Sequence, residues 1–381
     1  MIWEQDGWGI REVKDMKKIV ISGVNMTEGG ILSIFRDCLQ NIDRLLTSKY
    51  KIIALVHNKN LFSDLNLNNN IEFIEFEDSK RSWFKRCYYE YFYFRKLSKK
   101  LKPYLWLSLH DITPNIESEK LAVYCHNPTP FYNMKFKDIK YDKKVFLFSK
   151  FYKYLYRINI RKNNYVIVQQ NWIKEEFKKM YGIKNIIVAP PENNYSVKFE
   201  EKKEIENNSF FYPSFPRVFK NFEIICQAVE LLEKENINNF KVYLTIDGSE
   251  NLYSKEIIEK YKNLKCIEFL GLISREKVFE YYSRVECLIF PSKLETWGLP
   301  ISEFKQFNKP IILSELPYAH ETVGDFAKCL FFNPNSAEEL KNQMLKIINK
   351  ENRFSENKKE INRKLYAENW EELFEILLEE K

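Results

Sequence analysis

One stretch of the chain, residues 288–303, constrains the fold more than any other. It opens with an apolar run closed by Pro291-Ser292, which is typical of a buried strand, continues through a turn, and enters a helix at Pro300. The helix therefore begins at the carboxyl end of a strand. In open α/β sheets ligands bind at this position, because free backbone N–H groups and the positive end of the helix dipole converge there. The stretch predicts a parallel α/β sheet with a ligand site at this edge.

Two carboxylates, Glu295 and Glu303, lie on either side of the predicted helix start. One is in the loop and the other about a turn into the helix, so both could face one bound molecule whose anionic part is held by the backbone between them. Paired acceptors around an anion site suit a molecule with hydroxyls and phosphates, such as a nucleotide sugar. The alternative is a solvated helix face, because glutamate is abundant in this chain and the spacing alone is weak.

The sequence from Glu295 to Glu303, Glu-Thr-Trp-Gly-Leu-Pro-Ile-Ser-Glu, resembles the E-x7-E motif of retaining GT-B glycosyltransferases of glycosyltransferase family 4, of the type that assembles bacterial polysaccharides. The resemblance extends from Met16 over nearly the whole remaining chain. It implies a GT-B fold, in which two Rossmann-like doubly wound α/β domains face a central cleft.

Apolar runs of strand length alternate with helical stretches, which independently indicates βαβ units and mainly parallel sheets. A chain of 381 residues is too long for one ordinary core, so two domains are expected. The predicted strands are 19–23, 51–56, 71–76, 106–109, 121–124, 165–168 and 186–189 in the first half, and 210–212, 242–246, 266–270, 288–290 and 311–313 in the second.

The strand and helix pattern lapses into prolines, asparagines and charge between residues 189 and 204, which predicts a domain boundary. We expect a flexible leader at 1–15, where no periodicity is present. An N-terminal acceptor domain is expected at 16–195 and a C-terminal nucleotide-sugar domain at 205–365. The resemblance implies that a final helix within 366–381 crosses back onto the N-terminal domain.

A glycine loop with Gly29 and Gly30 follows the first predicted strand and precedes a helix. Glycine lets the backbone approach a phosphate closely, although a tight turn explains the pair equally well. The resemblance implies that this pair lines the cleft near the donor phosphate and the acceptor.

Three histidines follow predicted strands. For His110 a structural role and a functional role stay equally open, and His57 is expected to be structural. His126 resembles the cleft histidine of the family that contacts the donor sugar, so we expect a functional role for it.

Arg217 and Lys220 stand between the first strand and first helix of the second half, where two cations can clamp a diphosphate or simply be solvated. The family carries an Arg and a Lys here, commonly in a Gly-Arg…Lys-Gly loop. In this chain Pro216 replaces the glycine before Arg217, and Asn221 replaces the glycine after Lys220. The family resemblance also implies that the loop with Gly271 and Leu272 lies against the nucleotide base.

These residues imply a mechanism. No Asp-x-Asp pair ends a strand and no His/Cys cluster has metal spacing, so we expect no metal or other cofactor. The expected catalytic residues are Arg217, Lys220, Glu295 and His126, and the expected donor-binding residues are Gly29, Gly30, Gly271, Leu272, Thr296, Trp297, Gly298, Leu299 and Glu303. The cations and the backbone N–H groups of Gly298 and Leu299 would hold the diphosphate, Glu303 the ribose hydroxyls and Glu295 the donor-sugar hydroxyls. By resemblance the anomeric configuration is retained through front-face attack, without a covalent nucleophile.

The net positive charge and its distribution indicate which kinds of surface the protein could bind. The net charge is +7, and segments 80–102 and 135–162 interleave basic with aromatic residues. That pattern suits an anionic membrane surface, and it equally suits helices that bury aromatics and expose lysine. No nucleic-acid-binding motif accompanies the charge.

Seven scattered cysteines fit a reducing cytosol, and no signal peptide or apolar run of membrane-spanning length is present. We expect a cytoplasmic protein that can attach to the inner face of the membrane.

The sequence therefore predicts a metal-independent hexosyltransferase that moves a sugar from a nucleotide-diphosphate donor to a glycan or lipid-linked acceptor in polysaccharide synthesis. A nucleotide-sugar epimerase of the same fold and a non-catalytic nucleotide-sugar-binding protein remain alternatives. The sequence does not identify the donor base, the sugar, the acceptor, the linkage or the oligomeric state.

Overall fold

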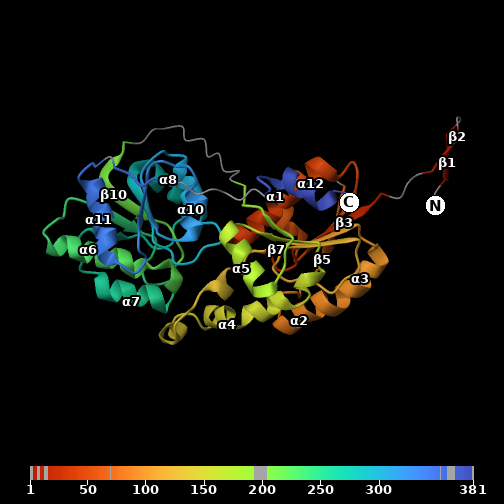
Figure 1. Cartoon of the computed structure of the whole chain (residues 1–381), viewed down its shortest axis with the longest axis horizontal. Helices are drawn as coiled ribbons and strands as arrows, with labels where there is room; N and C mark the ends of the chain where they lie inside the picture. The colour runs from red at the N-terminus through yellow and green to blue at the C-terminus, as the bar shows by residue number, and fades with distance from the viewer. Residues whose placement is uncertain are drawn as a thin grey trace.

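The computed structural model describes residues 3–6, 9–12, 16–68, 70–192, 204–351, 353–357 and 365–379. These residues form two α/β domains, each built on one parallel sheet, which lie side by side along the long axis of the molecule (Figure 1). The alternation of strands and helices in the sequence predicted this architecture. The predicted end of the N-terminal domain, residue 195, lies outside the described residues.

The N-terminal sheet has seven strands in the order β5-β4-β3-β6-β7-β8-β9, all parallel. The strands are β3 (Lys18–Ser22), β4 (Lys51–Val56), β5 (Ile71–Glu75), β6 (Leu105–Ser108), β7 (Lys120–Cys125), β8 (Tyr165–Val168) and β9 (Ile186–Val188). The helices are α1 (Gly29–Leu46), α2 (Trp83–Tyr88), α3 (Phe94–Leu101), α4 (Lys143–Arg157) and α5 (Asn171–Tyr181).

Both faces of the N-terminal sheet are covered. Along β3, Ile19 and Ile21 pack in one hydrophobic cluster with α1, whereas Val20 packs in another with Phe94 of α3. Side chains alternate between the faces of a strand, so a sheet buried on both faces needs a continuous apolar run. The run in β3 meets this requirement.

The C-terminal sheet has six strands in the order β12-β11-β10-β13-β14-β15, also all parallel. The strands are β10 (Glu206–Tyr212), β11 (Lys241–Leu244), β12 (Ile267–Phe269), β13 (Val285–Phe290), β14 (Ile311–Ser314) and β15 (Cys329–Phe332). The helices are α6 (Phe222–Lys234), α7 (Leu252–Tyr261), α8 (Arg275–Arg284), α9 (Leu299–Lys305), α10 (Pro317–Val323) and α11 (Ala337–Ile348).

The strand order reverses once in each sheet, between β3 and β6 in the first and between β10 and β13 in the second. At such a switch point the two neighbouring loops leave in opposite directions and open a crevice at the carboxyl ends of the strands. The loops after β10 and β13 carry Lys220 and Glu295, and the first turn of α1, which follows β3, carries Gly30. The topology therefore places these three predicted site residues at the switch points.

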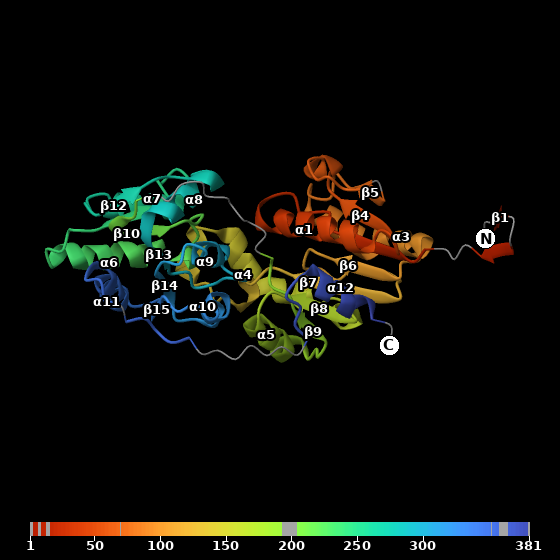
Figure 2. The same cartoon turned by 90° about the horizontal axis from the view of Figure 1, so that it is seen from above.

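The last helix, α12 (Trp370–Leu378), lies on the N-terminal domain beside α1 (Figure 2). Its residues Trp370, Leu373, Phe374 and Leu377 are buried in the same cluster as β3. A fully buried side chain of this size contributes about 1.5–3 kcal/mol, so this one face fixes the helix to the first domain. The chain therefore crosses between the domains twice.

Two features differ from the sequence expectations. Residues within 1–15 form a hairpin of β1 (Trp3–Asp6) and β2 (Gly9–Glu12), which lies apart from both domains (Figure 2). Neither Trp-Glu-Gln-Asp nor Gly-Ile-Arg-Glu is a continuous apolar run or alternates apolar with polar residues, so no pattern in the sequence marks these strands. The basic aromatic run between α2 and α3 is interrupted by η2 (Tyr89–Tyr93), a stretch of π-helix. Such wide turns have no signature in the sequence pattern.

Candidate active site

A cavity of about 400 Å³ lies between the domains at the switch points. The N-terminal domain lines it with residues of α1 and of the loops after β7, β8 and β9, and the C-terminal domain lines it with the loops after β10 and β13. The lining residues are Gly30, Ile31, Ser33, Ile34, Asp37, His126, Gln169, Pro191 and Glu192 from the first domain, and Lys220, Glu295, Thr296, Trp297, Gly298, Leu299 and Pro300 from the second. Most of the predicted site residues are therefore brought into one cleft.

Lys220 and Glu295 form an ion pair of 2.5 Å within the cleft. Their side chains are 19% and 12% exposed, so the pair is partly shielded from water. Lys220 ends a short 3-10 helix, η6 (Val218–Lys220), and its carbonyl accepts a hydrogen bond of 2.9 Å from the Tyr212 hydroxyl at the end of β10. The backbone at Lys220 is thus tied to the strand that precedes it.

Asn221 explains why the loop after Lys220 needs no glycine. Its φ of +61° lies in the left-handed region, which asparagine tolerates better than most residues. The buried side-chain amide donates to the carbonyls of Pro291 (3.1 Å) and Pro334 (2.9 Å). These bonds tie the Lys220 loop to the end of β13, so the departure from the family pattern preserves the turn.

Gly298 shapes the start of α9. Its φ is +88°, and a Cβ atom here would lie 3.0 Å from Cδ1 of the buried Ile301. The loop before it is fixed by two contacts: the Trp297 indole N–H donates to the Ser302 hydroxyl (2.9 Å), and the Thr322 hydroxyl donates to the Trp297 carbonyl. The backbone N–H groups at the head of α9 are therefore presented to the cleft by a rigid turn.

Arg217 does not line the cavity. Its Nη1 atom lies 2.6 Å from Oδ2 of Asp142, the N-cap of α4 in the other domain, and its side chain is 42% exposed. The ion pair bridges the two domains. A second bridge joins Glu256 of α7 to the Lys140 ammonium (2.7 Å) and the Tyr141 hydroxyl (2.5 Å).

Glu303 is buried and does not line the cavity. Its carboxylate accepts hydrogen bonds from Arg275 (2.6 Å) and from the Tyr282 hydroxyl (3.2 Å). Burial raises the pKa of Glu303 above its usual range, and Arg275 opposes that rise. The motif's two glutamates thus differ: Glu295 faces the cavity, whereas Glu303 is covered by an arginine.

The loop predicted to meet the nucleotide base also lies outside the cavity lining. Gly271 has a φ of +68°, and a Cβ atom there would lie 2.6 Å from Oδ2 of Asp247, so this position favours glycine. Leu272 is 60% exposed. Gly29 begins α1 beside the cleft, but only Gly30 of the pair lines it.

His126 and His110 have different environments. His126 lines the cleft, and burial lowers its pKa, so its imidazole is neutral at pH 7. Gln169 donates to its Nδ1 atom (3.2 Å). His110 is buried away from the cavity, where it contacts Ser22 (3.2 Å) and Arg86. These contacts support a structural role for His110.

Sequence reasoning missed three residues that line the cleft, Asp37, Gln169 and Glu192, and it also missed Asp142, which forms an ion pair with Arg217. A signal was present for Asp37, because Gly30, Ser33, Ile34 and Asp37 have the spacing of one helix face. The other three depend on contacts between distant segments, which no local pattern encodes.

No group of His, Cys, Asp and Glu residues in the described part of the chain could hold a metal ion. Across the same residues, no helix combines the length and apolarity that a membrane span requires.

Residues 192–364 match the family model described as Glycosyl transferases group 1, a segment that contains the whole C-terminal sheet. Over 233 residues the chain is 22% identical to the O-antigen chain mannosyltransferase RfbU of Salmonella typhimurium. That alignment spans 59% of this chain and 60% of the relative, so a substantial part of the relative lies outside the match.

Solved structures show the same architecture. Sucrose-phosphate synthase of Thermosynechococcus elongatus has a TM-score of 0.60 at 15% identity, covering 87% of this chain and 90% of the other. HepE of Anabaena, solved in complex with UDP-glucose, has a TM-score of 0.57 at 13% identity, covering 87% and 90%. The chain has the GT-B fold, and the fold together with the family match supports a GT-B glycosyltransferase.

Proposed function

We propose that this protein is a retaining, family 4-like glycosyltransferase that moves a hexose from a nucleotide-diphosphate donor to a glycan or lipid-linked acceptor in cell-surface polysaccharide synthesis. One observation carries the proposal: Lys220 and Glu295 of one domain face Gly30 and His126 of the other across a single cavity. The names of the similar proteins support it, since one is an O-antigen mannosyltransferase and another was solved with UDP-glucose.

In this account the donor replaces the protein's own ion pairs. Lys220 leaves its ion pair with Glu295 and binds the diphosphate instead. The freed Glu295 carboxylate then accepts hydrogen bonds from the donor-sugar hydroxyls. Arg217 likewise exchanges Asp142 for phosphate, and Glu303 exchanges Arg275 for the ribose hydroxyls. The N–H groups of Gly298 and Leu299 contact the diphosphate, Thr296 and Trp297 the sugar, and the Gly271–Leu272 loop the base.

The leaving diphosphate gains charge as the glycosidic bond breaks, and fixed cations and N–H groups in a partly dry cleft stabilise that charge without reorganisation. We propose that these protein groups replace a divalent ion, so activity should persist in EDTA. The acceptor hydroxyl attacks from the face that the diphosphate leaves, and a phosphate oxygen takes its proton. His126, neutral and beside the cavity, contacts the donor sugar.

Incubation with UDP-glucose, UDP-galactose and GDP-mannose in EDTA, with and without a glycoside acceptor, tests this function. We expect slow hydrolysis of one donor, faster transfer when acceptor is added, and a product whose anomeric configuration, read from its NMR coupling constants, matches the donor. An inverted product would contradict retention. Epimerised sugar without transfer would favour an epimerase, and binding without turnover would favour a binding protein.

In the proposed function Asp142 competes with the donor for Arg217, so removing the charge of Asp142 should strengthen donor binding. Asp142→Asn should tighten nucleotide-sugar binding several-fold, because it releases Arg217 from an ion pair of 2.6 Å. Asparagine can still accept the cap hydrogen bond that Asp142 accepts from the Val145 N–H (2.8 Å), so α4 should stay intact. Calorimetric titration measures the change. Arg217→Ala is the counterpart and should weaken binding; unchanged affinity in both variants would remove Arg217 from the donor site.

We also propose that α2, η2 and α4 attach the protein to the anionic inner face of the membrane. Trp83 of α2 contacts Phe148 of α4 edge-on at 6.0 Å between ring centroids, so these helices share one surface (Figure 1). Part of the aromatic content is buried, as the alternative interpretation predicted, but a basic and aromatic exterior remains. Its exposed members include Phe84, Phe92, Phe151 and Tyr154.

Vesicle sedimentation tests the attachment. The protein should bind phosphatidylglycerol vesicles and not phosphatidylcholine vesicles at low salt, and the binding should fall as salt rises. Phe84→Ser with Phe92→Ser should reduce binding at least several-fold, because both rings are exposed. Leu252→Ser, an exposed residue on the C-terminal domain, is the matched control. Binding that ignores lipid charge, or that survives the double substitution, would contradict this attachment surface.

A further inference from the structure

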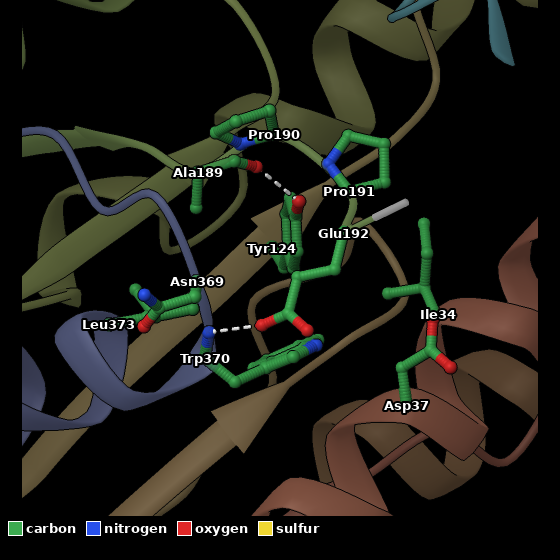
Figure 3. A pocket seen from close by; sticks show the side chains of 10 residues that line it. All are labelled: Ile34, Asp37, Tyr124, Ala189, Pro190, Pro191, Glu192, Asn369, Trp370 and Leu373. Carbon is green, nitrogen blue, oxygen red and sulfur yellow. Dashed lines mark hydrogen bonds between the residues drawn. The ribbon is translucent and has the colours of Figure 1, made fainter. Parts of the chain in front are cut away.

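The two segments of chain that cross between the domains are tied together on the N-terminal domain. The Val188 N–H donates to the Leu365 carbonyl (2.9 Å), and the Ala367 N–H donates to the Val188 carbonyl (2.9 Å). Figure 3 shows the Glu192 carboxylate accepting a hydrogen bond of 2.7 Å from the Trp370 N–H at the start of α12. Both crossings therefore reach the N-terminal domain at the end of β9, so the placement of the C-terminal domain depends on direct contacts between the domains.

One direct contact joins α5 to α10, which lie side by side in both views (Figure 1 and Figure 2). The N–H groups of Asn171 and Trp172 begin α5 and therefore have no carbonyl partner within that helix. Both donate to the Glu321 carboxylate of α10, at 2.6 and 2.9 Å. The start of a helix in one domain is thus capped by a carboxylate from the other.

Gln170, the residue before α5, makes a second contact with α10. Its Nε2 atom donates to the Thr322 hydroxyl (2.8 Å) and to the Tyr318 carbonyl (3.1 Å). Its Oε1 atom accepts a hydrogen bond of 2.6 Å from the Trp172 indole N–H. An indole nitrogen can only donate, so this bond fixes which end of the amide faces α10. Gln170 is fully buried, so water does not compete for these hydrogen bonds.

Thr322 connects this contact to the cleft, because its hydroxyl donates to the Trp297 carbonyl in the turn before α9. The Tyr318 carbonyl lies 2.9 Å from the same hydroxyl. It is the usual acceptor, since a threonine in a helix commonly donates to the carbonyl four residues earlier. The hydroxyl has one proton and cannot donate fully to both carbonyls. Gln170 gives the Tyr318 carbonyl another donor, which leaves the threonine proton for Trp297.

We propose that Gln170 and Thr322 are positioning residues for the donor loop, residues 295–299, and that this loop takes its active geometry only when the N-terminal domain is docked. Gln170 directs the Thr322 hydroxyl to the Trp297 carbonyl, and that bond holds the turn that presents the N–H groups at the head of α9. The inference rests on the proposed glycosyl transfer, and it adds a contribution of the first domain to the donor site of the second.

Two substitutions at Thr322 test the role of the hydroxyl. Thr322→Val keeps the shape of the side chain and removes the hydroxyl, whereas Thr322→Ser keeps the hydroxyl and removes a methyl group. The donor is whichever of UDP-glucose, UDP-galactose and GDP-mannose the protein hydrolyses, and turnover is measured as release of the nucleoside diphosphate.

We expect Thr322→Val to lower kcat at least about tenfold, because small displacements of groups that contact the transition state are costly, and to change the donor Kd less than about threefold. Thr322→Ser should keep kcat within about threefold of wild type, since it can still donate to Trp297. Equal losses of kcat in the two variants, or no loss in Thr322→Val, would overturn the positioning role.

Thr113→Val is the control for the loss of a buried threonine hydroxyl. The Thr113 hydroxyl accepts a hydrogen bond of 2.8 Å from the Asn163 amide, just as the Thr322 hydroxyl accepts one of 2.8 Å from Gln170, but Thr113 is outside the cavity lining. The two threonines are 1% and 2% exposed. Both valine variants should lower Tm by about 2–4 °C, and only Thr322→Val should lower kcat. Similar losses of kcat in both would mean that stability alone explains the effect.

A double-mutant cycle tests whether Gln170 acts through Thr322. Gln170→Met keeps an unbranched side chain and removes the amide, so the threonine proton can return to the Tyr318 carbonyl. We expect kcat to fall several-fold in Gln170→Met, and to fall no further in the double variant with Thr322→Val than in Thr322→Val alone. Losses that multiply in the double variant would show that the two residues act independently, which would overturn the coupling.

The same measurements separate this inference from the function on which it rests. Donor turnover by wild type together with an unaffected Thr322→Val would overturn the positioning role and leave the glycosyl transfer intact. If wild type neither binds nor turns over any of the three nucleotide sugars, the glycosyl transfer itself is contradicted, and the inference falls with it.

Discussion

Replacing Lys220 by alanine is expected to lower kcat for sugar transfer about 100- to 1,000-fold, the usual effect of removing one preorganised group from a developing negative charge. Lys220 lines the cavity with a side chain that is 19% exposed, so little water reaches it to screen its charge. The same change leaves the Glu295 carboxylate without its 2.5 Å partner beside the diphosphate. Both effects act against the transition state.

A double variant separates these two effects. If the loss in Lys220→Ala came only from the orphaned Glu295 charge, adding Glu295→Gln would restore activity. We expect no recovery of activity, because the loss of the Lys220 cation causes most of the decrease in kcat. Lys241→Ala removes a lysine whose ion pair with Glu268 is exposed, and it should leave kcat within twofold of wild type. Steady-state kinetics measures all three, and turnover in Lys220→Ala within a few-fold of wild type would contradict the proposed clamp.

Gly298→Val is expected to reduce turnover more than 100-fold and to lower Tm. A non-glycine residue at a φ of +88° costs about 1–2 kcal/mol, and the new Cβ would meet Ile301 Cδ1 at 3.0 Å. Ile301 is fully buried, so the first turn of α9 must shift instead, and the N–H groups at its head move with it. We expect this displacement to lower the rate of transfer more than it lowers the free energy of unfolding, because catalysis depends on the exact position of these N–H groups.

Gly182 provides the control for that substitution. It also has a positive φ, +65°, but it caps the end of α5 outside the cavity lining, and the nearest atom to a new Cβ is 3.6 Å away. Gly182→Val should lower Tm by a similar amount and leave kcat nearly unchanged. Circular dichroism confirms that each variant folds, and Gly298→Ala serves if the valine variant does not. Equal loss of activity at both glycines would mean that stability alone explains the effect.

The fold could be predicted from the sequence because its signals are local. Continuous apolar runs such as 288–290 mark strands buried on both faces, and the helix start after Gly298 follows from a glycine and a proline. The stripe of Trp370, Leu373, Phe374 and Leu377 is likewise a local period. The pairing of β1 with β2 and the π-helical turn at η2 escaped prediction, since neither has a characteristic apolar pattern in the sequence.

The candidate site could be predicted only in part, because ion pairing depends on contacts between distant segments. The sequence identified Lys220 and Glu295, and the switch point between β10 and β13 brings them together. It could not show that Arg275 covers Glu303 or that Asp142, from the other domain, holds Arg217. Because of these ion pairs, Arg217 and Glu303 must each leave a protein partner before they can bind the donor. No local sequence pattern encodes such a pairing.

The most direct test of the account is calorimetric titration of wild type and Lys220→Ala with UDP-glucose, UDP-galactose and GDP-mannose in EDTA. The account predicts that one of these nucleotide sugars binds wild type without a divalent ion, and that its affinity falls at least about tenfold in the variant. Failure of all three to bind, or an affinity that Lys220→Ala leaves unchanged, would contradict a nucleotide-sugar site in the cleft between the two domains.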